Sequence, residues 1–130
     1  MKTIIATVVG VISGGIAIWI FELIGHIIFP LNFDIDPTNL DEMKLLMFKI
    51  PVKSMIAVIL AHVLGIIVGM YAATFVEKES FTPLYIVGGL LMLGSVLKLV
   101  AIPHPKWFAV TDILVSMIGI YGFLMFRKKA

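Results

Sequence analysis

Six ionisable side chains lie in or beside long apolar runs of this sequence, where a charge is costly. They are Glu22, His26, His62, Lys98, His104 and Asp112. Ionisable residues inside a membrane are rare, turn away from lipid, pair with one another, and often belong to ligand sites or proton pathways. These six residues are therefore the candidate ligand-binding residues.

One chemistry that these residue types allow is metal binding. Glu22 and His26 are four residues apart, which places them on one face of a helix. With His62 from a neighbouring helix they would form a set of two histidines and one carboxylate, suited to Zn²⁺ or Fe²⁺ with an open coordination position. Asp112 or His104 would be a fourth ligand. This hypothesis is a metal-dependent membrane enzyme or a metal transporter.

A second hypothesis, which we favour, is a polar pocket that binds or transports a lipid-like or amphipathic small molecule. Glu22, His26 and His62 would anchor the polar part of this molecule, and Lys98 would be available to a carboxylate or phosphate head group. No serine and histidine are arranged in a way that indicates nucleophilic catalysis, so no catalytic residue is assigned.

A third hypothesis is a structural or accessory membrane subunit without small-molecule chemistry. In that case the ionisable groups only fix the pairing of helices, with Glu22 against His26 or His62, and Lys98 against Asp112. Buried charges in membrane proteins often have such partners. The residue types fit all three hypotheses.

Membrane-spanning helices must position these residues. Of the 130 residues, 61% are hydrophobic and 14% are charged, and the mean hydropathy is +1.12, which indicates an integral membrane protein. A helix needs about 20 apolar residues to cross a bilayer, and four segments qualify, at about 3–29, 54–76, 81–102 and 107–126. We therefore expect one all-α domain over residues 1–130, an antiparallel four-helix bundle in a lipid bilayer.

Other features of the composition exclude further classes of site and partner. The chain has no cysteine, which excludes disulfides and thiolate ligands. A formal net charge of +2 is too small to predict a nucleic-acid partner. The apolar run that follows Lys2 is longer than the hydrophobic part of a signal peptide. We therefore expect this run to be the first membrane span and not a cleaved signal peptide.

The first connection between spans is long and has a helical pattern of its own. Asp36 or Thr38 could cap a helix N-terminus, and Asp41 and Glu42 would complement its dipole. Apolar residues then recur at helical spacing up to Ile50. We expect a short amphipathic helix at about 37–50 on the outer interface, acting either as a connector or as a lid.

Small residues occupy the half of each predicted helix that the ionisable residues leave free. The sequences GVISG and GIIVG, at 10–14 and 65–69, permit close approach of two helix backbones. Ionisable and small residues share helix faces at a spacing of seven in three pairs, which are Gly15 with Glu22, His62 with Gly69, and Asp112 with Gly119. We therefore expect a wedge that is closed at the glycine end and has an outward-opening polar pocket. The same faces could also serve a homo-oligomer.

Depth and orientation follow from residue counts. At about 1.5 Å per residue, Glu22 lies roughly 10 Å and His62 roughly 13 Å below the outer ends of their helices. Four spans put both termini on one side, which carries five lysines and arginines in its connections against four on the other. The C-terminal FRKKA and the acidic first loop favour cytoplasmic termini in a bacterial inner membrane.

The motifs also resemble known families. The sequence combines E-x3-H-x3-P at the end of the first span, a D-x-D-P loop, a proline at the start of the second span and HP-x-WF at the start of the fourth. This combination resembles a family of small, uncharacterised bacterial proteins with four membrane spans, over essentially the full chain. The resemblance implies the bundle and no particular activity.

The stretch FELIGH is similar to the first helix of small multidrug-resistance exporters. In that family a membrane-embedded glutamate precedes an apolar pair and a glycine, which would be residues 22–25 here. The long first loop, His62, Lys98, Asp112 and the HPKWF segment depart from the family's pattern.

Overall fold

The structure is a computed structural model that describes residues 1–30, 38–47, 49–101 and 105–129. These residues form five helices and no strand. The helices are α1 (Lys2–Ile28), α2 (Leu40–Met47), α3 (Val52–Val76), α4 (Thr82–Ala101) and α5 (Lys106–Lys129). The expected all-α bundle is confirmed. Within the described residues four helices are long and apolar enough to cross a membrane, and on this basis the chain is an integral membrane protein.

Prolines mark the ends of the long helices. Helix α1 ends where the Phe29 N–H donates to the Gly25 carbonyl, directly before Pro30. Pro51 precedes α3 in an extended conformation. Pro105 precedes α5, and its carbonyl oxygen accepts a hydrogen bond from the Phe108 N–H in the first turn of that helix. A proline has no N–H to lose at a helix start, so these residues separate the spans without breaking them.

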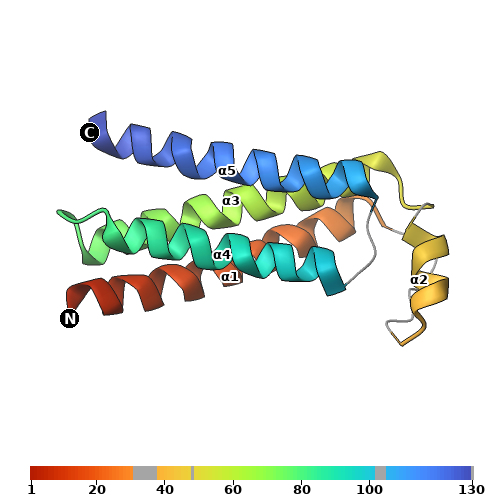
Figure 1. The fold of residues 1–130 in the computed structure, drawn as a ribbon, viewed down its shortest axis with the longest axis horizontal. Helices are drawn as coiled ribbons and strands as arrows, with labels where there is room; N and C mark the ends of the chain where they lie inside the picture. The colour runs from red at the N-terminus through yellow and green to blue at the C-terminus, as the bar shows by residue number, and fades with distance from the viewer. Residues whose placement is uncertain (31–37, 48, 102–104, 130) are drawn as a thin grey trace.

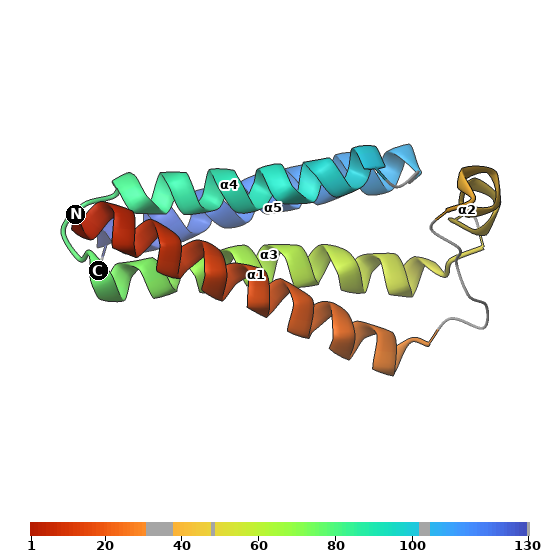
Figure 2. The ribbon, with the colours of Figure 1, turned by 90° about the horizontal axis from the view of Figure 1, so that it is seen from below.

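The four long helices lie side by side and alternate in direction, as Figure 1 shows. Both termini and the α3–α4 connection lie at one end of the bundle, and α2 lies at the other end (Figures 1 and 2). Helices α3 and α4 each pack against the three other long helices, but α3 is the central one, because it is the most buried span and the α1–α3 interface is the most extensive. The prediction of an antiparallel bundle did not include this central role.

Helices α1 and α3 cross in backbone contact at four glycines. A Cβ atom placed on Gly10 would lie 2.8 Å from the Gly69 carbonyl oxygen, and one on Gly69 would lie 2.6 Å from the Gly10 carbonyl oxygen. Gly14 and Gly65 make the same reciprocal approach, at 3.0 and 3.1 Å. No side chain fits between the helices at these positions. The two small-residue motifs therefore close the end of the bundle that holds the termini.

Gly15, which we expected to help close the glycine end of the wedge below Glu22, is not part of this crossing. A Cβ atom on Gly15 would meet nothing within 4 Å. Gly14 and Gly10 are four residues apart and share the face that meets α3, whereas Gly15 points about a quarter turn away. Beyond the crossing, α1 diverges from α3 and α4 towards the end that holds α2 (Figure 2), which gives the expected wedge.

The buried apolar residues form two clusters along α3. The larger, near the glycine crossing, comprises Ala6, Ile66, Met70, Ala73, Leu84, Val87, Leu91 and Leu124. The smaller, near the wide end, comprises Met55, Ile59 and Phe108. His62 lies between Ile59 and Ile66, about one helical turn from each. A polar layer therefore separates two dry clusters.

Helix α2 is shorter than the expected 37–50. Its first turn is capped by Asn39, whose side-chain oxygen accepts the Glu42 N–H at 3.1 Å, a cap that the sequence did not lead us to expect. Asp36 lies outside the described residues. Asp41 and Glu42 occupy the first turn as expected, where their charges favour the helix dipole. The position of α2 at a membrane interface stays a prediction.

Candidate functional site

Four ionisable side chains, one from each long helix, form a continuous chain of polar contacts. Nδ1 of His62 lies 3.0 Å from both carboxylate oxygens of Asp112. On the other edge of the ring, Nε2 lies 3.0 Å from Oε1 of Glu22. Lys98 donates to the two oxygens of Glu22 at 3.2 and 3.3 Å. We call Asp112, His62, Glu22 and Lys98 the charge chain.

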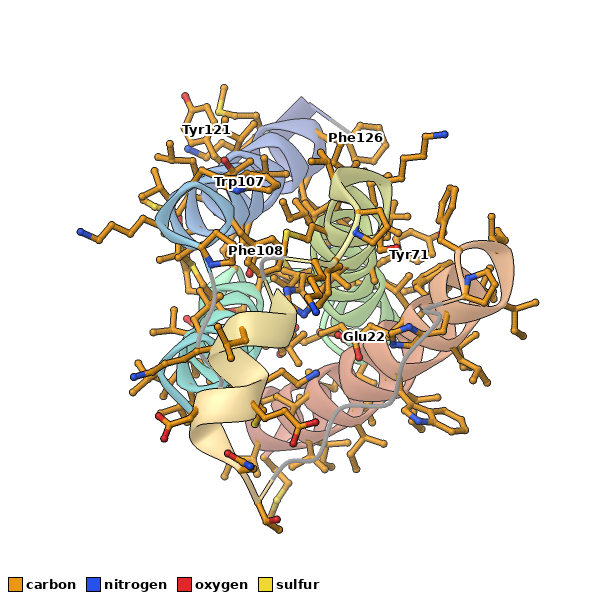
Figure 3. All side chains as sticks on the ribbon, turned by 90° about the vertical axis from the view of Figure 1, so that its right-hand side faces the viewer. Glu22, Tyr71, Trp107, Phe108, Tyr121 and Phe126 are labelled. Atoms are coloured by element: carbon orange, nitrogen blue, oxygen red, sulfur yellow. The ribbon has the colours of Figure 1, made fainter. Side chains whose placement is uncertain are left out.

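The charge chain runs from the core of the bundle towards its surface. Asp112 and His62 are 1% and 3% exposed, whereas the side chains of Glu22 and Lys98 are 20% and 52% exposed. Figure 3 shows Glu22 projecting from α1 towards the middle of the bundle. The inner pair is thus enclosed by protein, and the outer pair can exchange partners.

The net charge of the charge chain explains why these four side chains can be buried. An ionised carboxylate can only accept hydrogen bonds, so an imidazole between Asp112 and Glu22 donates from both nitrogens if both acids are ionised. His62 is then an imidazolium ion. If the ring is neutral, one of the two acids carries the proton instead. In both arrangements the four residues sum to zero charge, which lowers the cost of holding them in an apolar medium.

The observed ion pairs differ from those expected under the third hypothesis, a structural or accessory subunit. Glu22 does contact His62, but Lys98 contacts Glu22 and not Asp112. Asp112 faces α3 and contacts His62, and the α4–α5 interface is the smallest one between the long helices. His26 is exposed. His104 lies outside the described residues.

The geometry contradicts the Zn²⁺ or Fe²⁺ set of Glu22, His26 and His62. A metal needs donor atoms that converge on one point. Both ring nitrogens of His62 already face carboxylates, and these lie on opposite edges of the ring. Among the residues that the structure describes, no three His, Cys, Asp or Glu side chains are arranged to hold a metal ion.

A cavity of about 190 Å³ adjoins the charge chain between α1, α3 and α4. Its lining residues are Gly15, Ile18, His62, Leu91, Gly94, Ser95 and Lys98. We call it the α1–α4 groove. Cβ atoms on Gly15 and Gly94 would meet nothing within 4 Å, so the two glycines create much of this space. The Ser95 hydroxyl donates to the Leu91 carbonyl at 3.3 Å, which leaves Lys98 as the strongest polar group on the wall.

Sequence reasoning found the two ionisable residues of the groove, His62 and Lys98, and missed the rest of its wall. Ile18, Leu91 and Ser95 carry no chemistry that would have distinguished them. A usable pattern did exist, since Gly94 lies four residues before Lys98 and Gly15 lies seven before Glu22. A glycine on the face of a charged residue marks open space there.

A second, much smaller cavity of about 10 Å³ lies between α1 and α3. It is lined by Glu22, Gly25, His26, Ser54, Ala57 and Val58. We call it the Ser54 cavity. The Ser54 hydroxyl oxygen is buried and has no hydrogen-bond partner within the described part of the chain.

No family model, curated protein or solved structure matches this chain. The family resemblances of the motifs therefore stay predictions, and the function is argued from the geometry of the charge chain and its two cavities.

Proposed function

We propose that this protein binds, and moves within or across the membrane, a lipid-like or amphipathic small molecule with an anionic head group. The observation that carries this proposal is the position of Lys98 on the wall of the α1–α4 groove. Its side chain is half exposed, and it contacts Glu22 at one side. A lysine ammonium has three donors, so it can also bind a carboxylate, phosphate or sulfonate.

The walls of the groove suit the apolar part of such a ligand. Ile18 and Leu91 are apolar, and Gly15 and Gly94 present no side chain. On the neighbouring lipid-facing surfaces, Trp19 of α1 and Leu97 of α4 are exposed. An acyl chain that leaves the groove would thus enter lipid and not water.

The size of the groove limits what it encloses. A volume of about 190 Å³ is smaller than the roughly 300–1,000 Å³ of pockets that bury a whole drug-sized ligand. The groove fits a head group and the first part of one chain. We therefore favour single-chain amphiphiles whose tails lie mostly in the bilayer.

The same proposal includes an orientation. Cytoplasmic termini would place the glycine crossing towards the cytoplasm and the charge chain in the outer half of a bacterial inner membrane. The basic C-terminal segment supports this orientation. The groove would then receive its ligand from the outer leaflet.

A structural or accessory role is the second candidate. The observation in its favour is that the charge chain is internally paired and sums to zero charge. In that case substitutions in the charge chain would change the stability of the protein, and the protein would bind no such ligand.

Decanesulfonate binding to the purified protein in an uncharged detergent tests the proposal. Sulfonate stays ionised, and decanol and decyltrimethylammonium provide neutral and cationic chains of the same length. We expect decanesulfonate to bind more tightly than either. Lys98→Met, which keeps the apolar stem, should weaken binding at least tenfold, about 1.4 kcal/mol.

The matched control is Lys106→Met, an exposed lysine at the start of α5 that is not among the groove-lining residues. Its affinity for decanesulfonate should equal that of the unsubstituted protein. If the sulfonate binds no better than decanol, or if the Lys98 and Lys106 variants behave alike, the proposal is wrong.

A further inference from the structure

The Ser54 cavity has the properties of a site for one water molecule. A buried hydroxyl without a partner costs about 1–3 kcal/mol, and Ser54 has none among the residues that the structure describes. The cavity's volume of about 10 Å³ is close to the roughly 10–15 Å³ that one water needs. Glu22, His26 and Ser54 supply polar groups on its wall, whereas cavities that stay empty have apolar walls.

This water would connect Glu22 with the surface of the bundle. His26 lies one helical turn beyond Glu22 on α1, lines the same cavity and is exposed. Histidine can both donate and accept protons. A proton path therefore leads from the bundle surface near the end of α1, through His26 and the water, to the Glu22 carboxyl.

An anionic ligand gives this path a function, because it changes the charge balance of the site. The charge chain sums to zero, and an anion at Lys98 would bring it to minus one next to two apolar clusters. An uncompensated charge in such a medium is strongly unfavourable. Uptake of one proton restores the balance.

Glu22 is the group placed to take that proton. The groups that face it are His62 from α3, Lys98 from α4 and, through the cavity, Ser54 and His26. A lysine ammonium has no lone pair that could accept a proton. Asp112 is buried on α5, where it contacts His62, and it lines neither the Ser54 cavity nor the α1–α4 groove.

We propose that binding of an anionic head group at Lys98 is coupled to uptake of one proton by Glu22, delivered through a water molecule in the Ser54 cavity. Lys98 transfers its contact from Glu22 to the head group. Glu22 gains an O–H that can donate to the water, and its second oxygen still accepts from His62. One anion and one proton enter together, so the site remains neutral. This inference rests on the proposed function and specifies how the same site is regulated.

Titration calorimetry with decanesulfonate in buffers of different ionisation enthalpy measures the coupling. The probe itself does not titrate, so any proton taken up belongs to the protein. We expect about one proton per bound sulfonate at neutral pH, and none for Glu22→Gln, which mimics the neutral acid and should still bind. Difference infrared spectra should show the carbonyl band of a protonated carboxyl on binding, absent from the Glu22→Gln variant.

The rate of proton uptake tests the role of the Ser54 cavity. Ser54→Val removes the hydroxyl and fills the space, so a pH indicator in stopped flow should report proton uptake at least tenfold slower while the final uptake is unchanged. An unchanged rate overturns the role of the water.

The remaining outcomes separate the two proposals. If decanesulfonate does not bind the unsubstituted protein, the proposed function fails and the coupling fails with it. If it binds in a Lys98-dependent way and the heat is independent of the buffer, only the coupling is wrong. Uptake that persists in Glu22→Gln also overturns it.

Discussion

His62 contacts Asp112 across the α3–α5 interface, with Nδ1 3.0 Å from each carboxylate oxygen. Both side chains are enclosed by protein, so this contact holds two helices together and cannot easily exchange with a ligand. The contact between Glu22 and Lys98 is more exposed. The inner half of the charge chain therefore has a structural role, and the outer half is the part open to a ligand.

The inner pair should show strong energetic coupling. Removal of one partner leaves a buried charge unpaired, and we expect Asp112→Leu or His62→Leu alone to cost about 3–5 kcal/mol. The double variant should cost clearly less than the sum, because Glu22 keeps Lys98 as its partner. Unfolding in mixed detergent micelles measures all three. Costs that add to within about 0.5 kcal/mol would show that the two residues are independent.

The glycine crossing should not tolerate a methyl group. A Cβ on Gly69 would lie 2.6 Å from the Gly10 carbonyl oxygen, and this contact is with backbone, which cannot turn aside. We expect Gly69→Ala to destabilise the bundle by about 1–3 kcal/mol, measured by the same unfolding experiment.

The matched control is Gly89→Ala on α4, where the added Cβ meets nothing within 4 Å. Alanine is a better helix former than glycine by about 1 kcal/mol, so this change should be neutral or stabilising. Equal losses at Gly69 and Gly89 would mean that the α1–α3 crossing does not hold the bundle.

Filling the α1–α4 groove should remove binding without unfolding the protein. Gly15 lines the groove and has open space around it, so Gly15→Leu should reduce decanesulfonate affinity at least tenfold with little change in stability. Gly89→Leu is the control, since Gly89 is equally open but is not among the groove-lining residues. A similar affinity in both variants would place the ligand elsewhere.

Orientation can be measured separately from the site. A reporter that fluoresces only in the cytoplasm should be active when fused after the C-terminus, whereas an enzyme active only outside the cytoplasm should work when inserted in the first loop. The reversed pattern would leave the charge chain unchanged and would turn the groove towards the inner leaflet.

Composition and helical period predicted a large part of this structure. The four spans follow from hydrophobic length, and the wedge follows from the many glycines that lie deeper in each helix than its nearest ionisable residue. Short motifs also indicated the close approach at 10–14 and 65–69. These features depend on local sequence patterns, which can be recognised in one amino-acid sequence.

The partners of each polar group could not be predicted in the same way. Lys98 was expected to meet Asp112 because they lie at similar depth on helices adjacent in the chain. The observed pairs depend on how far each helix is rotated about its axis, which is set by packing around α3. The same rotation brings Gly14 into the crossing and leaves Gly15 in the groove.

The central claim is that an anionic single-chain amphiphile occupies the α1–α4 groove with its head group at Lys98. Photo-crosslinking of a fatty acid with a diazirine near its carboxylate, mapped by mass spectrometry in lipid nanodiscs, tests it most directly. We expect label on groove residues such as Ile18 and Ser95, and loss of that label in Lys98→Met. Label spread over lipid-facing residues such as Trp19 and Leu97, equal in both proteins, would contradict it.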